Sequence, residues 1–321
     1  MTMAAPVGSD TLLCTLSNRV RAEDSAYPPD GTCDLLFYDS FFMDGKNDLT
    51  KGNDSLDPGA RHFVKRASLS WNTAFGISFA PPTAALQKHY RSSEFYSEIS
   101  NLWTKRIRHF GFVNLYRQFS EQDALAEALI TLRFESVSLL EEISNLSIAV
   151  PVSLSLSLAG RFYTPRFTDP ASPKDEEFGL FKPCRDFNTT RYGDPVSVVC
   201  ESEQVDWKYE SKTRLNYVYT FSKAEKRTLT YETKGTLTNK ASNAACAQEY
   251  RRTVCDTKYH FVRLSYNLAA YDIDYDASPT GCRRFGLSSG AFNRLSHVRA
   301  LHEYLQTKYT NPNKIFDCRA T

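Results

Sequence analysis

The 321-residue sequence predicts an α/β fold in which parallel strands alternate with helices. Short apolar runs typical of buried strands occur at residues 11–17, 34–38, 74–79 and 110–115. Along residues 150–158, aliphatic side chains alternate with proline and serine, so one face of this strand is apolar and the other is small and polar. Apolar residues at helical spacing predict helices over residues 94–106, 120–132, 137–146 and 292–309.

The chain changes character between residues 166 and 262, where Thr, Tyr, Lys and Cys become more frequent. Runs at 215–221 and 226–234 are typical of hairpin strands, and a helix is expected near 244–252. We therefore expect a mostly β subdomain inserted into the α/β fold. The expected parts are 1–165, 166–262 and 263–321, and the last part holds a strand at 262–274 and the final helix.

Composition excludes several classes of protein. Lys and Arg number 39 against 37 Asp and Glu, a net charge of +2, which argues against a nucleic-acid binder. No apolar run approaches the roughly 18 residues that a membrane span needs. No Cys-x-x-Cys and no His-Glu-x-x-His motif occurs, so we expect no metal site and no cofactor.

Eight cysteines and three glycosylation motifs, at Asn53, Asn145 and Asn188, indicate an oxidising, extracellular environment. The first residues lack a charged segment followed by an apolar one, as a signal peptide would have. Either the protein is cytosolic with eight thiols, or a signal peptide lies upstream of the given sequence. We favour the second alternative, because an even number of cysteines suggests pairing.

Four segments, in this order, resemble secreted chitinases and chitinase-like proteins of glycoside hydrolase family 18. Residues 12–38 resemble their first two strands, each with a Cys, and 150–165 resemble their seventh strand and its Gly-Arg-x-Phe-like turn. Residues 200–240 resemble their inserted α+β subdomain, and 269–276 resemble the eighth strand with its Asp-x-Asp. The resemblance implies a fold derived from a TIM barrel with an inserted α+β subdomain.

The barrel that this resemblance implies is incomplete, because strands five and six have no corresponding sequence. About 35 residues, filled by two predicted helices, separate the fourth strand from the seventh. Without the insertion about 220 residues are left, fewer than the roughly 250 that eight βα units normally take.

The catalytic motif of this family, Asp-Gly-x-Asp-x-Asp-Trp-Glu on strand four, is absent. In the corresponding segment, which contains Gly111, Val113 and Leu115 replace aspartates and Arg117 replaces the catalytic Glu. An arginine stays protonated near neutral pH and cannot serve as a general acid. The neighbouring carboxylates Glu121 and Asp123 are expected at a helix start, where capping is the simpler role.

The stacking Trp of strand eight is also absent, since Ala269 stands in its place. We expect a secreted protein without glycosidase activity that binds a chitin-type glycan or a protein partner. Two alternatives stay open: an active glycoside hydrolase that uses another carboxylate such as Asp274 or Glu121, and a secreted scaffold that binds no sugar.

The candidate ligand-binding residues lie near strand ends and in the insertion. They are Tyr116, Arg161, Trp207, Tyr209, Asp272 and Asp274. Trp207 and Tyr209 either line a sugar groove or form the core of the subdomain. Asp272, Asp274 and Asp276 would share one strand face. They would form either a metal-binding or catalytic carboxylate cluster or a hydrogen-bond network at the strand end. We expect the network, with Arg161 close to Asp272 or Asp274.

We expect the cysteines to pair in sequence order, which is one of about 105 connectivities. The expected bridges are Cys14–Cys33, Cys184–Cys200, Cys246–Cys255 and Cys282–Cys318. The first would join adjacent strands, the middle two would lie in the insertion, and the last would fix the C-terminal tail.

Overall fold

A computed structural model of the chain describes residues in all three predicted parts. The described residues are 11–17, 20–39, 42–43, 46–47, 56–78, 93–111, 153–179, 182–185, 191–201, 207–212, 217–241 and 267–308.

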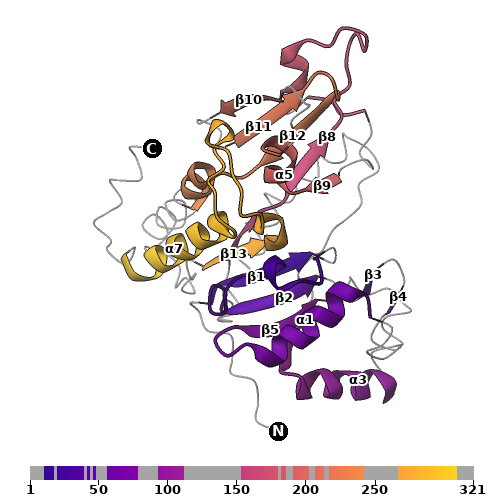
Figure 1. Ribbon diagram of the computed structural model, residues 1–321, viewed down its shortest axis with the longest axis vertical. Coiled ribbons are helices and arrows are strands. Elements are labelled where there is room, and N and C mark those ends of the chain that lie inside the picture. The colour runs from indigo at the N-terminus through magenta and orange to yellow at the C-terminus, as the bar shows by residue number, and fades with distance from the viewer. Residues whose placement is uncertain are drawn as a thin grey trace, which may run out of the picture.

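A six-stranded parallel sheet forms the lower part of the molecule in Figure 1. Its strands, in chain order, are β1 (Leu13–Ser17), β2 (Leu35–Asp39), β5 (Ala74–Ser78), β6 (Ile107–Gly111), β7 (Ser153–Ser157) and β13 (Asn267–Tyr271). They lie side by side in the order β6-β5-β2-β1-β13-β7. The first and last strands are neighbours, with Leu13 opposite Ala269. This pairing of chain ends is what a barrel of βα units requires.

The expected α/β architecture with a barrel-derived parallel sheet is confirmed, and the sheet is open. Within the described residues no strand lies between β6 and β7, so these two strands form its edges. No helix within the described ranges is both long enough and apolar enough to cross a membrane.

Within the described residues, three helices accompany this sheet. They are α1 (Pro58–Leu69), α3 (Ser93–Thr104) and α7 (Asn293–Lys308). The last two agree with the predicted helices at 94–106 and 292–309. Phe63 of α1 and Leu295 of α7 are fully buried in one core with Leu16, Tyr38 and Ile77 of the strands. Such burial of large apolar side chains is the main stabilising contribution to the fold.

Helix α1 was not predicted, because its first turn falls in a turn-rich stretch and basic residues are interspersed among its apolar ones. Its start has a clear signal nonetheless: Asp57 accepts a hydrogen bond from the N–H of Ala60 at 3.0 Å, and Pro58 occupies the first helical position. Both are favoured at helix N-termini. The polar segment before it also holds two short strands, β3 (Phe42–Met43) and β4 (Lys46–Asn47), which form an antiparallel pair.

A second, antiparallel sheet forms the upper part of the molecule (Figure 1). Its strands are β8 (Gly160–Tyr163), β9 (Arg191–Gly193), β10 (Trp207–Lys212), β11 (Tyr217–Ser222) and β12 (Arg227–Tyr231). They lie in the order β10-β11-β12-β8-β9, and the hairpin β11–β12 matches the two predicted runs. Helix α5 (Pro195–Val199) and a helix at 234–241 complete this part. It therefore has the α+β character expected of an insertion.

Two predicted strands have different bounds in the structure. The strand expected at 110–115 is β6, which begins at Ile107, and the strand expected at 262–274 is described only as β13, which ends at Tyr271. Asp272 has a φ of 56°, and a short 3-10 helix, Ile273–Asp276, follows. Other 3-10 turns occur at Asp24–Ala26, Asp175–Phe178 and Arg283–Phe285. The predicted helices at 120–132, 137–146 and 244–252 lie outside the described residues.

One predicted disulfide is confirmed and two are wrong. Cys14 of β1 is bonded to Cys33, with 6.0 Å between their Cα atoms. Cys200 is bonded to Cys282, 82 residues away, so neither the Cys184–Cys200 nor the Cys282–Cys318 bridge forms. The thiol of Cys184 instead donates to the carbonyl oxygen of Lys182 at 3.8 Å. The predicted Cys246–Cys255 bridge lies outside the described residues.

Candidate functional site

Polar residues gather where the parallel strands end. β1, β2, β5 and β7 end at Ser17, Asp39, Ser78 and Ser157, and Asp272 follows β13. The carboxyl ends of parallel strands meet at one edge of a sheet, which is where ligands bind in most α/β proteins. We call Ser17, Asp39, Ser78, Ser157, Asp272 and Asp274 the carboxyl-edge site.

Asp272 leaves the strand in a left-handed conformation, with φ 56° and ψ 47°. This conformation is uncommon for residues other than glycine, although Asp adopts it more readily than most. The N–H of Asp272 donates to Oγ1 of Thr15 at 3.1 Å, and its carboxylate accepts a hydrogen bond from Oγ of Ser157 at 3.2 Å. Asp272 therefore connects both strands that flank β13.

Asp274 turns toward the end of β1. Its carboxylate accepts hydrogen bonds from the backbone N–H of Ser17 at 2.8 Å and from the Ser17 hydroxyl at 2.6 Å. Asp276 points elsewhere, to a buried ion pair with Arg294 at 2.7 Å. The expectation that Asp272, Asp274 and Asp276 share one strand face is thus wrong, because the strand ends before them and the 3-10 turn separates their directions.

Asp39 was not among the predicted site residues. It is the last residue of β2 and is only 9% exposed. Burial raises the pKa of Asp39 to about 6, a hydrogen bond from Ser78 lowers it, and the charge of Asp272 raises it. A strand-ending Asp after an apolar run is the signal that would have found it.

The other two carboxyls of the site are shifted in the same direction. Burial raises the pKa of Asp272, while the Ser157 hydrogen bond and the charge of Arg161 lower it. Burial also raises the pKa of Asp274, to about 6, against the two hydrogen bonds from Ser17. A carboxyl with a pKa of about 6, as at Asp39 and Asp274, is partly protonated near pH 6 and can then donate as well as accept hydrogen bonds to a polar ligand.

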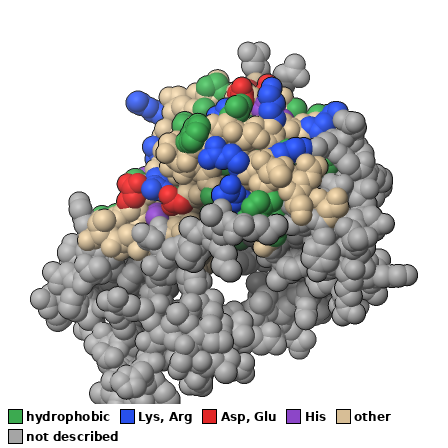
Figure 2. All heavy atoms as spheres, turned by 90° about the horizontal axis from the view of Figure 1, so that it is seen from below, with side chains coloured by type: hydrophobic (Ala, Val, Ile, Leu, Met, Phe, Trp, Pro, Cys, Tyr) green, Lys and Arg blue, Asp and Glu red, His purple; other side chains and the backbone are tan. Residues whose placement is uncertain are grey.

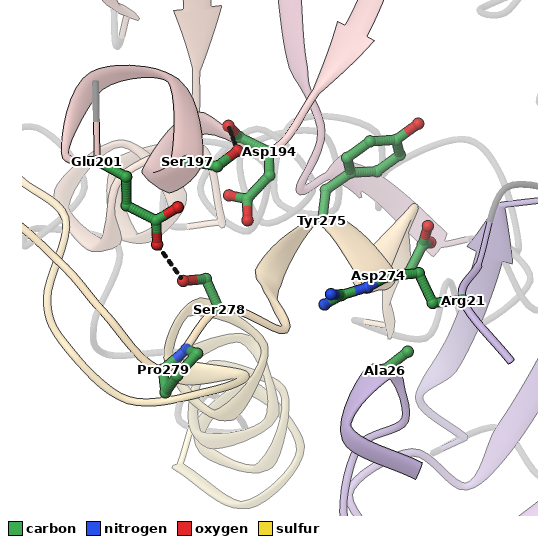
Figure 3. A pocket seen from close by; sticks show the side chains of 9 residues that line it. All are labelled: Arg21, Ala26, Asp194, Ser197, Glu201, Asp274, Tyr275, Ser278 and Pro279. Atoms are coloured by element: carbon green, nitrogen blue, oxygen red, sulfur yellow. Dashed lines mark hydrogen bonds between the residues drawn. The ribbon is translucent and has the colours of Figure 1, made fainter. Parts of the chain in front are cut away.

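A pocket of about 420 Å³ lies beside this edge, between the parallel sheet and helix α5. Figure 3 shows that Arg21 and Ala26 come from the segment after β1, Asp274 to Pro279 from the segment after β13, and Asp194 to Glu201 from around α5. Asp274 belongs both to the pocket lining and to the carboxyl-edge site. The volume falls in the range of small-ligand sites.

The lining of the pocket holds three carboxylates and two serine hydroxyls. Asp194 caps α5 by accepting the N–H of Val196 at 2.8 Å, and burial raises its pKa. Glu201 accepts a hydrogen bond from the hydroxyl of Ser278 at 3.4 Å (Figure 3) and another from the hydroxyl of Thr280 at 2.7 Å. Arg21, the cation of the lining, is paired with Glu23 at 3.0 Å. Hydroxyl and carboxylate groups converging on a cavity suit a ligand rich in hydroxyl or amide groups.

Of the predicted ligand-binding residues, Asp272 and Asp274 lie in the carboxyl-edge site. Arg161 lies in β8, opposite Thr230, and is close enough for its charge to lower the pKa of Asp272. Trp207 and Tyr209 lie in β10, an edge strand of the second sheet, opposite Ser222 and Thr220.

Several predicted positions lie outside the described residues. They are Val113, Leu115, Tyr116, Arg117, Glu121, Asp123, Asn53, Asn145 and Asn188. Within the described ranges, no group of three or more His, Cys, Asp or Glu side chains is placed to hold a metal ion.

The chain resembles known proteins in structure but not in sequence. No known protein family and no curated protein sequence matches the chain. Among solved structures, a Group IV chitinase from Ostrinia furnacalis, in complex with allosamidin, aligns with a TM-score of 0.50 and 11% identity, over 92% of this chain and 100% of that one.

Two further chitinase structures align at slightly lower scores. An immunomodulatory active chitinase from Trichuris suis has a TM-score of 0.49, 13% identity, and coverage of 92% of this chain and 99% of that one. A mutant class V chitinase from Cycas revoluta, in complex with (GlcNAc)3, has a TM-score of 0.45 and 10% identity, over 90% and 99%. The strand order with adjacent first and last strands, the inserted second sheet and the alignment with the Ostrinia furnacalis enzyme lead to one conclusion: this chain has a chitinase-like fold.

Proposed function

We propose that this chain is a secreted chitinase-like protein that binds a chitin-type oligosaccharide at the carboxyl-edge site without hydrolysing it. The observation that carries the proposal is the sequence that follows β6, the fourth strand when counted outward from β1. The segment resembling the catalytic motif continues from Gly111 with Val113, Leu115 and Arg117 at the positions of two aspartates and the catalytic glutamate. A guanidinium cannot protonate a leaving oxygen near neutral pH.

The environment of Ala269 also supports loss of hydrolysis. Ala269 stands where the resemblance places a stacking Trp, is 3% exposed, and lies between Leu13 of β1 and Ser155 of β7. A methyl group there offers no ring face to a sugar. Binding at the cleavage position would therefore depend on hydrogen bonds rather than on stacking.

The capacity to bind is supported by the polar groups that remain. Asp39 and Asp274 supply carboxyls whose pKa is raised to about 6, Asp272 adds a third carboxyl with a raised pKa, and the adjoining pocket adds the hydroxyls of Ser197 and Ser278. Sugar hydroxyls and acetamides are matched by such mixed donors and acceptors. Secretion is supported by the Cys14–Cys33 and Cys200–Cys282 disulfides, which persist in oxidising compartments.

Turnover of a fluorogenic chitobioside tests the absence of hydrolysis. We expect no release of fluorophore above that of a buffer control from pH 4 to pH 8. Arg117→Glu alone should stay inactive, because Val113 and Leu115 cannot orient the substrate's acetamide or tune a new acid. Turnover by the purified wild-type protein that Asp274→Asn abolishes would refute the proposal.

A second candidate function is a glycoside hydrolase that uses Asp39 as its acid. The observation that favours it is the pKa of about 6 at a buried carboxyl on the carboxyl edge, a value suited to a general acid. The same fluorogenic assay decides between the two. Activity that disappears in Asp39→Asn, and persists in the exposed control Asp30→Asn, would select the enzyme.

A third possibility, a protein partner in place of a sugar, is tested by a glycan array. Under the leading proposal, chitin-type oligomers give signal above unrelated neutral glycans. A blank array together with stoichiometric binding of a protein would favour a scaffold that binds no sugar.

A further inference from the structure

A tryptophan is displayed at the opposite edge of the parallel sheet. Trp71 lies three residues before β5 and is 82% exposed, and Leu69, the last residue of α1, is 61% exposed. Arg106 directly precedes β6, the neighbour of β5. The amino ends of parallel strands share one edge, so these residues lie away from the carboxyl-edge site. We call Leu69, Trp71, Trp103, Lys105, Arg106 and Arg108 the amino-edge platform.

The loop that displays Trp71 is held rigidly. The carboxylate of Asp30 accepts hydrogen bonds from the N–H groups of Trp71, Asn72 and Thr73 at 2.9, 3.1 and 3.0 Å. The Thr73 hydroxyl accepts the N–H of Gly31 and donates to the carbonyl oxygen of Cys33, both at 2.9 Å. Because Cys33 is bonded to Cys14 in β1, the loop is tied to the sheet. An exposed Trp on an ordered loop binds a ligand with little further loss of conformational entropy.

Arginines accompany both tryptophans of the platform. The guanidinium of Arg106 lies over the Trp71 ring, 4.8 Å from its centroid, and that of Arg108 lies 5.9 Å from the Trp103 centroid. Arg106 reaches this position from a left-handed backbone with φ 69°, which is unfavourable for a side chain of its size. Uncommon backbone at a turn is retained where the surrounding contacts require it.

The platform carries uncompensated positive charge. Within the described part of the chain, Lys105, Arg106 and Arg108 take part in no ion pair. The nearby Asp30 carboxylate is engaged by three N–H groups. Figure 2 shows the molecule from the side on which α1 and α3 lie in Figure 1, and there hydrophobic and basic side chains adjoin one another. An anionic ligand is the complement of such a surface.

We propose that the amino-edge platform binds an acidic polysaccharide, one that carries sulfate or carboxylate groups. Arg106 and Arg108 would pair with these anions, and Trp71 and Leu69 would cover the apolar face of a sugar ring. The free ring face and exposed aliphatic side chain beside three cations suit a sugar ring with attached anions better than a purely charged peptide.

Calorimetric titration with a heparin octasaccharide tests this proposal on the full chain. We expect saturable binding that weakens as NaCl rises from about 50 to about 300 mM. Trp71→Ala and Arg106→Gly should each weaken binding about tenfold or more. Glycine is chosen at position 106 because it adopts the positive φ without strain, so the change removes the side chain and keeps the turn.

A matched control is available at Arg284. Its guanidinium lies 5.3 Å from the centroid of Phe285, but that ring is buried, so Arg284→Gln should leave heparin affinity unchanged. Neutral chitotetraose, bound at the carboxyl edge, should bind Trp71→Ala and wild type equally, which separates this test from that of the proposed function.

Unchanged heparin affinity in folded Trp71→Ala and Arg106→Gly, or no heparin binding by wild type, would overturn the proposal. Equal, Trp71-dependent binding of a poly-glutamate peptide or of phosphatidylserine vesicles would also overturn it, because the face would then recognise another class of partner.

Discussion

The buried ion pair between Asp276 and Arg294 shows how single residues hold the two parts of the fold together. Both side chains are almost fully buried, and Oδ1 of Asp276 accepts the Nε–H of Arg294 at 2.7 Å. Oδ2 accepts the N–H groups of Arg294 and Leu295 at 2.9 Å, at the start of α7. The guanidinium also donates to the carbonyl oxygen of Glu232, just after β12. One carboxylate thus caps α7 and holds an arginine that reaches the second sheet.

Removing this carboxylate should be costly. Asp276→Ala leaves a buried guanidinium unpaired and α7 uncapped, so we expect the free energy of unfolding in urea to fall by about 3–5 kcal/mol. The exposed ion pair of Asp175 with Lys208 is the control, and Asp175→Ala should leave the free energy of unfolding nearly unchanged, because solvent screens exposed pairs. Equal losses in the two variants would contradict this account.

Asp39 makes stability depend on pH in an unusual direction for an aspartate. Its folded-state pKa of about 6 exceeds the ordinary 3.8 of the unfolded chain, so the folded protein holds the proton more tightly. The stability contributed by the protonated form is full below pH 4 and is lost as pH rises through 6. Urea unfolding should show that Asp39 contributes a fall of about 2–3 kcal/mol over this range; Asp39→Asn should remove that contribution and leave the part due to Asp274.

Asp30 provides the opposite case. Partial burial raises its pKa, but the three backbone N–H groups outweigh this and lower it below 3.8. Its stabilising contribution is therefore present at neutral pH and lost as pH falls below 4.

The test of Asp39 has a clear contrary outcome. If the unfolding free energies of Asp39→Asn differed between pH 4 and pH 7 by as much as those of wild type, the buried environment of Asp39 would be refuted.

At the scale of elements, the Cys200–Cys282 disulfide joins the end of α5 to the loop after β13. This bridge fixes one wall of the pocket relative to the other, because Glu201 directly follows Cys200 and Ser278 lies four residues before Cys282. A closed loop of this length restricts the unfolded chain strongly.

The double variant Cys200→Ser, Cys282→Ser should lose about 4 kcal/mol of unfolding free energy, within the usual range of about 2–5. In the same variant, the two pocket walls that carry Glu201 and Ser278 should no longer be held at a fixed distance. Peptide mapping of the unreduced protein checks the pairing directly, and a cross-linked peptide containing Cys184 and Cys200 would contradict it.

The elements that could be predicted from the sequence are those with a local signal. The alternation along 150–158 predicts β7, and the spacing of Leu295, Val298 and Leu305 predicts α7. Helix α1 has two local signals, the Asp57-Pro58 start and the helical spacing of its buried residues Ala60, Phe63, Val64 and Ala67. The end of β13 depends on the backbone of Asp272, which pairs with Thr15 from the other end of the chain. Contacts of this kind, like the Cys200–Cys282 bridge, leave no mark in neighbouring residues.

At the scale of the whole molecule, topology determines where the candidate site lies. Because β1 and β13 are neighbours, Ser17 and Asp274 meet although 257 residues separate them. Asp272 and Asp274 could be singled out from the sequence, because an Asp-x-Asp after an apolar run indicates a strand end. Asp39 also follows an apolar run and could have been found in the same way, whereas the pocket could not, because its lining comes from α5 and from the segments after β1 and β13.

The central claim is that the carboxyl edge binds a chitin-type oligosaccharide and leaves it intact. Calorimetric titration of the wild-type protein with chitotetraose tests both halves at once. The account predicts a saturable heat of binding near one ligand per chain, reduced in Asp39→Asn, with a return to baseline after every injection. A continuing heat flow from hydrolysis, or no heat of binding at all, would contradict it.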